Sequence, residues 1–85
     1  MKVEIDVPAY DANKGMQYQW TNLFDIGIRI ENGAVLIEAN KEGLLSLANH
    51  LLNLAQDGIP AGHHMHFDAD NSLNDGSSEL FIQKK

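Results

Sequence analysis

Cysteine is absent from this 85-residue sequence, and its absence excludes two kinds of site. Without thiols the chain has no disulfide to stabilise it and no thiolate ligand for a metal ion. Because so short a chain builds only a small core, its stability must come from apolar packing, a partner or an ion. We expect one domain, residues 1–85.

Long hydrophobic runs are also missing from the sequence. No segment approaches the roughly 18 apolar residues that a membrane span requires. The first residues, "MKVEIDV", alternate charged and apolar side chains, unlike the continuous apolar stretch of a signal peptide. We therefore expect a cytoplasmic protein that does not enter a membrane.

Basic residues are few: 6 stand against 12 acidic ones, for a formal net charge of −6. A chain of this charge repels phosphate backbones and anionic lipids, so we expect no nucleic-acid or membrane partner. It would attract a basic protein partner. Acidity of this size is also ordinary for a small domain that only needs to stay in solution.

Motifs of catalysis are absent as well. There is no glycine-rich phosphate loop and no nucleophile elbow, and Ser77 and Ser78 have no evident histidine and aspartate partners. The segment "DADNSLNDGSSE" starts like a calcium loop but lacks the glycine at its sixth position. The sequence therefore predicts a protein that is not an enzyme.

Period-two patterns predict several strands. Residues 3–7 and, more weakly, 16–20 alternate apolar with polar side chains. Two apolar runs in "IGIRIENGAVLIEA" flank Asn32-Gly33, the dipeptide that a two-residue type I′ turn favours. That turn predicts a hairpin in which Ile30 faces Val35 and Ile28 faces Ile37.

A helix is predicted over "NKEGLLSLANHLLNLAQDG", with Asn40 as its N-cap and Gly58 as its stop. Helical spacing separates an apolar arc from a polar one. The apolar arc contains Leu44, Leu47, Ala48, Leu51, Leu54 and Ala55. The polar arc contains Glu42, Ser46, Asn49, His50, Asn53, Gln56 and Asp57. We expect the apolar arc to lie across a sheet and the polar arc, His50 included, to face solvent.

Two further strands are predicted after the helix, in "HHMHFD" and "ELFIQK". The expected fold is α+β: a two-layer sandwich of one mainly antiparallel sheet with five to six strands and one helix packed on one face, in the order strands, helix, strands. A single helix leaves the other face of the sheet open. That face would carry His64, His66, Asp68 and Phe81.

The stretch "GHHMHFD" is the strongest chemical signal in the sequence. Residues two apart on a strand point the same way, with Cα atoms about 6.5–7 Å apart, so His64 and His66 can hold one zinc or similar ion with help from Asp68 or His63. The alternative is that these side chains form a half-exposed contact surface. They can also hydrogen-bond the "GSSE" turn and have only an architectural role.

Residues 34–85 resemble the immunity protein 32 family of bacterial polymorphic-toxin systems. The resemblance lies in "KEGLLSLANHLLNLA", then "IPAGHHMHFD", then a closing "GSSELFIQKK". It implies a non-enzymatic protein without a cofactor that binds and neutralises a co-produced toxin. The expected contact residues on the open sheet face are His64, His66, Asp68, Glu79 and Phe81, and the toxin would be basic. Two remaining alternatives are a small zinc-binding domain that uses His64, His66 and Asp68, and a homodimer that pairs through Phe81 and Leu36.

Overall fold

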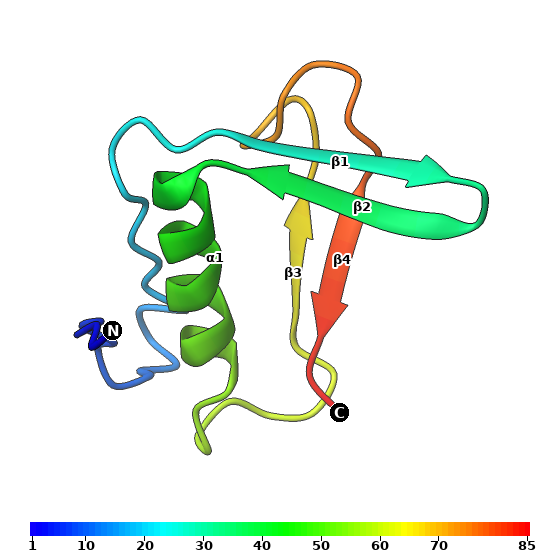
Figure 1. Cartoon of the computed structure of the whole chain (residues 1–85). Helices are drawn as coiled ribbons and strands as arrows, with labels where there is room; N and C mark the ends of the chain where they lie inside the picture. The colour runs from blue at the N-terminus through cyan, green and yellow to red at the C-terminus, as the bar shows by residue number, and fades with distance from the viewer.

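One helix and four strands make up the computed structural model, which describes residues 1–85. The elements are β1 (Ile26–Glu31), β2 (Ala34–Ala39), α1 (Lys41–Leu54), β3 (His64–Phe67) and β4 (Leu80–Gln83). The strands form two separate antiparallel sheets, β1–β2 and β3–β4 (Figure 1). The α+β class is confirmed, and the single sheet of five to six strands is wrong.

The β1–β2 hairpin has the register that the Asn-Gly turn predicts. Ile28 is paired with Ile37 and Ile30 with Val35. Both turn residues have positive φ, 51° at Asn32 and 79° at Gly33, as a type I′ turn requires. The turn and the apolar pattern therefore determine this hairpin together.

The two sheets are joined by the segment that precedes β4 rather than by strand pairing. Asn74 N–H donates to the Ile26 carbonyl at 2.8 Å, and Ser78 N–H donates to the Ile28 carbonyl at 2.8 Å. Ile28 N–H in turn donates to Ser77 Oγ at 3.2 Å. Because residues 74–78 occupy this edge of β1, the second sheet cannot extend the first.

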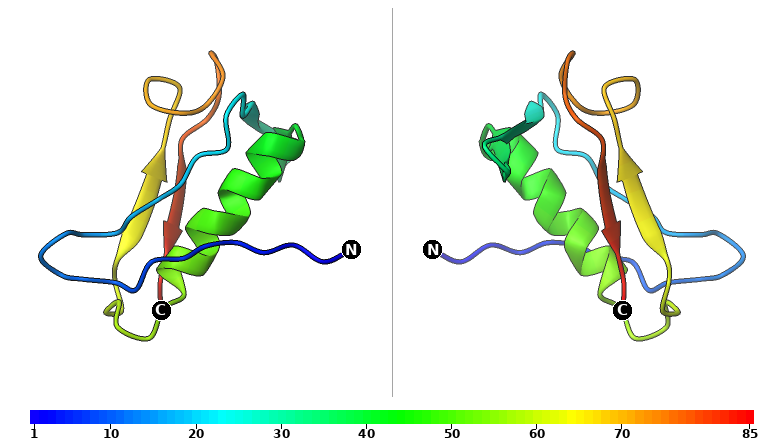
Figure 2. Two further views of the ribbon diagram at one scale, coloured as in Figure 1. Left: turned by 90° about the vertical axis from the view of Figure 1, so that its left-hand side faces the viewer. Right: turned by 90° about the vertical axis from the view of Figure 1, so that its right-hand side faces the viewer.

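The strands predicted at residues 3–7 and 16–20 are wrong. The only pairing before β1 is an isolated bridge between Asp11 and Gly15. The backbone of this segment is bonded by helix side chains instead: Gln19 N–H donates to Asn49 Oδ1 at 2.9 Å, and Thr21 N–H donates to Ser46 Oγ at 2.8 Å. A strand partner is not needed where side chains satisfy the backbone. Figure 2 shows this N-terminal segment running past α1.

Much of the predicted polar arc of helix α1 faces inward, and of the predicted apolar arc only Leu54 is buried in the core, with Leu47 packed against it. Ser46, Asn49, His50 and Asn53 are buried, whereas Leu44, Leu51 and Leu52 are exposed. The cause is the N-terminal segment, because the polar arc supplies its hydrogen bonds. Asn49 Nδ2 donates to the Asp6 carbonyl at 3.2 Å, and the Gln56 side chain bonds Tyr10 and Pro8.

The start of α1 is as predicted and its end is not. The Asn40 side chain caps the helix by accepting from Gly43 N–H at 2.7 Å. A Cβ on Gly43 would lie 2.7 Å from the Asp25 carbonyl oxygen, so only glycine lets the first turn approach β1 this closely. The helix ends at Leu54, and Gly58 does not take the left-handed conformation of a stop residue.

A small apolar core lies between α1 and the two sheets. Its buried members are Ile26, Ile28, Leu54, Ile59, Met65, Phe67 and Leu73. Leu47, Leu80 and Ile82 pack against it and remain partly exposed. Trp20 is 38% exposed, and its ring packs against those of Phe24 and His50. No helix has the length and hydropathy needed to cross a membrane.

Candidate functional site

The predicted site residues gather on the outward side of β3 and β4. Met65 and Phe67 are buried in the core, and strand alternation therefore turns His64 and His66 to the opposite side. In the register of this hairpin His66 is paired with Phe81. We call His64, His66, Asp68, Glu79 and Phe81 the histidine face.

Aromatic stacking fixes the centre of the histidine face. The His66 and Phe81 rings are nearly parallel, at 7°, with centroids 4.3 Å apart. The His64 ring lies on the same aromatic side chain, with its centroid 5.9 Å from that of Phe81. Stacking on Phe81 of the adjacent strand restricts rotation of the His66 ring and thereby the direction in which its Nε2 atom points.

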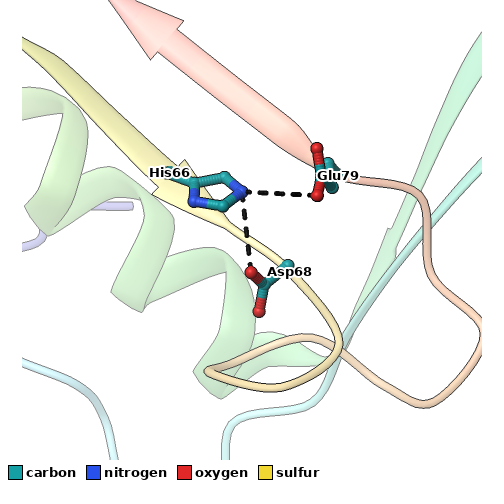
Figure 3. A group of neighbouring side chains, drawn as sticks. All are labelled: His66, Asp68 and Glu79. Atoms are coloured by element: carbon teal, nitrogen blue, oxygen red, sulfur yellow. Dashed lines mark ion pairs between the residues drawn. The ribbon is translucent and has the colours of Figure 1, made fainter.

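Two carboxylates lie close to the Nε2 nitrogen of His66. Asp68 Oδ2 lies 3.6 Å and Glu79 Oε1 3.9 Å from His66 Nε2 (Figure 3). Asp68 is held by its own loop, since its Oδ1 accepts from Asp70 N–H at 2.9 Å. That bond leaves Oδ2 directed at the imidazole.

The three groups are of ligand types that a divalent metal ion accepts, and they lie close together. One ligand atom from each of His66, Asp68 and Glu79 falls within 4.8 Å of the other two. Tetrahedral zinc with bonds of about 2.0–2.1 Å separates its ligand atoms by about 3.3 Å. The two histidine–carboxylate separations, 3.6 and 3.9 Å, exceed this value by a few tenths of an ångström, and the two carboxylates lie within 4.8 Å of each other.

Glu79 replaces His64 in this constellation. The sequence-based zinc hypothesis used His64, His66 and Asp68, whereas the ligand atoms that converge belong to His66, Asp68 and Glu79. The register provides the reason, since pairing His66 with Phe81 directs residues 68 and 79 at each other where the strands diverge. His64 lies two residue pairs from His66 in the other direction, opposite Gln83.

Sequence reasoning missed a second unusual group, the buried His50. It was expected in solvent, but it has no exposed surface, and neither ring nitrogen has a hydrogen-bond partner. Aromatic rings of Tyr18, Trp20 and Phe67 surround it, with centroids 4.6, 4.2 and 5.7 Å away. Burial lowers the pKa of His50 to about 4. It is therefore neutral at physiological pH and part of the packing under the N-terminal segment.

Comparison with known protein families identifies a match for this chain. The family model described as Immunity protein 32 matches residues 34–85, from the start of β2 to the end of the chain. The matched region includes α1, both strands of the second hairpin and every residue of the histidine face. No curated protein and no solved structure matches the chain.

Proposed function

Because the chain belongs to the Immunity protein 32 family, we propose that it protects a cell by binding a toxin protein and blocking its activity. The family match is the observation that carries this proposal. Charge supports it, since a net charge of −6 favours association with a basic partner and accelerates the encounter. No catalytic group is required, because occlusion of the toxin by a bound protein is enough.

Co-expression tests the proposal. The probe is the toxin domain whose gene adjoins the gene for this chain. It is expressed in a host cell from a separate inducible promoter. We expect growth to be restored when the chain is co-expressed, and the purified pair to bind with a nanomolar or lower Kd that weakens as salt is raised. Unrestored growth together with no measurable binding would refute the proposal.

A second candidate function is the binding of a zinc ion at His66, Asp68 and Glu79. The convergence of one imidazole and two carboxylates carries it, because these are ligand types that zinc accepts in proteins. Such an ion would neutralise two carboxylates on the histidine face and tie the loop after β3 to the start of β4. It would thus stabilise the second hairpin.

Zinc titration distinguishes the constellation in the structure from the one that the sequence predicts. We expect one zinc ion per chain and an increase in Tm that a chelator reverses. Replacing Glu79 by Gln or His66 by Asn is expected to weaken zinc binding about tenfold or more, whereas His64→Asn leaves it unchanged. Equal losses in all three variants, or no binding to the wild-type chain, would reject this site.

A further inference from the structure

The outward side of α1 carries large apolar side chains that nothing in the chain covers. Leu44 is 56% and Leu51 48% exposed. With Leu47 and Leu54 they form a stripe at helical spacing, and in that stripe Leu54 is buried in the core and Leu47 packs against it. The stripe therefore begins at the core and continues into solvent.

The β1–β2 hairpin has the same property. Ile26 and Ile28 are buried, and alternation and register place Ile30, Val35 and Ile37 on the same side of the hairpin. These three side chains are 64%, 61% and 45% exposed. The far half of the hairpin extends beyond the rest of the molecule (Figure 1), so its apolar side has no layer to pack on.

Both exposed sets are continuations of one core. We call Ile30, Val35, Ile37, Leu44 and Leu51 the apolar face. Scattered exposed leucines are ordinary on a small protein, but here five large exposed aliphatic side chains lie on β1, β2 and α1, and β2 and α1 meet at Asn40. Patches of this kind mark the places where proteins bind other proteins.

The exposed surface of the chain is larger than the average for a monomer of its mass. The chain exposes 5956 Å², whereas a folded monomer of 9.4 kDa is expected to expose about 5,000 Å². Exposed N-terminal residues account for part of the difference, and the apolar face contributes several of the largest exposed side chains. The apolar face is therefore part of the surface that this fold exposes beyond the average for its size.

Charge determines which partner fits the apolar face. A second copy of the chain would bring another net charge of −6 to the contact, so self-association is opposed by repulsion. A basic protein is attracted by the same charge and can bury the aliphatic side chains at the centre of the contact. We propose that the apolar face, rather than the histidine face, is the surface that binds the toxin.

This inference depends on the proposed function, and matched substitutions on the two faces test it. Leu44 and Phe81 are almost equally exposed, 56% and 57%, so serine at either position removes a similar exposed apolar group. We expect Leu44→Ser alone to weaken binding of the adjoining toxin domain about tenfold, and Leu44→Ser combined with Leu51→Ser to weaken it about a hundredfold and to abolish protection. Phe81→Ser is expected to bind and protect like the wild-type chain.

A second measurement uses single substitutions at positions that are already half-exposed, 48% at Leu51 and 57% at Phe81, and therefore disturbs the fold less. Since the chain has no cysteine, Leu51→Cys and Phe81→Cys each introduce a single thiol. Addition of the toxin domain is expected to protect the thiol at position 51 from alkylation and to leave the one at position 81 reactive. Protection at position 81 alone, or a dimer of the free chain that already protects position 51, would overturn the inference. In either case wild-type protection would leave the proposed function standing.

Discussion

Acidification from pH 7 to pH 4 is expected to lower the free energy of unfolding by about 3 kcal/mol through His50 alone. This side chain is fully buried, and both of its ring nitrogens lack partners. Burial holds its pKa at about 4 in the folded protein, against an ordinary value of 6.5. The difference between these two pKa values, two to three units, determines how much stability is lost.

The direction follows from which state binds the proton. Between pH 6.5 and about 4 the imidazole is protonated in the unfolded chain and neutral in the folded one. The unfolded state therefore binds more protons, and stability falls as the pH falls through this range. Tyr18, whose ring contacts His50, supplies no compensating charge, because burial raises the pKa of its hydroxyl further above the acid range.

Denaturant unfolding at pH 7, 5.5 and 4.5 measures the effect in the wild-type chain and in His50→Leu. Carboxylates titrate in both proteins, so the difference between their stabilities isolates the histidine. We expect the leucine variant to gain stability over the wild type as the pH falls, since leucine has no group that the unfolded chain can protonate. His64→Leu, on the exposed histidine face, should give no such gain. Parallel curves for the wild type and His50→Leu would show that position 50 is not buried as described.

Local sequence rules predict the parts of the fold that are determined by neighbouring residues. Asn32-Gly33 determines the turn of the first hairpin, and alternation about it determines the register. The alternation of His64 and His66 with Met65 and Phe67 likewise predicts which side chains of β3 face the core. Asn40 identifies the start of α1 because capping needs only the next three residues.

The orientation of α1 could not be predicted by the same rules. Helical periodicity shows which side chains share a face but not which face is covered. Here the covering segment lies about 30 residues earlier in the sequence, as in the bond from Gln19 to Asn49, and it is held by amide and hydroxyl groups. The signal was present in Ser46, Asn49, Asn53 and Gln56, whose spacing aligns four hydrogen-bonding side chains along one face.

Strand alternation was predicted correctly and the orientation of α1 was not, and this difference explains which candidate site the sequence revealed. The histidine face lies where alternation predicts, and extending the β3–β4 register explains why Glu79 joins His66 and Asp68. The apolar face could not be found while the leucines were assigned to the core. The apolar face exists because the polar side of α1 is buried inside the molecule. Leucine side chains on the other side of the helix are therefore exposed to solvent, where they can bind another protein.

The orientation of α1 is the central claim, and thiol labelling of the free protein tests it most directly. Ser46→Cys and Leu51→Cys place one thiol each on opposite sides of the same helix, in a chain that has no other cysteine. Ser46 has no exposed surface, whereas Leu51 is half-exposed. A buried thiol reacts only when the structure opens, so burial slows its alkylation.

We expect the thiol at position 51 to react at nearly the rate of an unfolded peptide and the thiol at position 46 to react about a hundredfold or more slowly. Both should react at the same rate in denaturant, which serves as the control. The reverse order in the native protein, with position 46 reactive and position 51 protected, would place the leucines in the core. It would contradict both the fold described for α1 and the binding surface inferred from it.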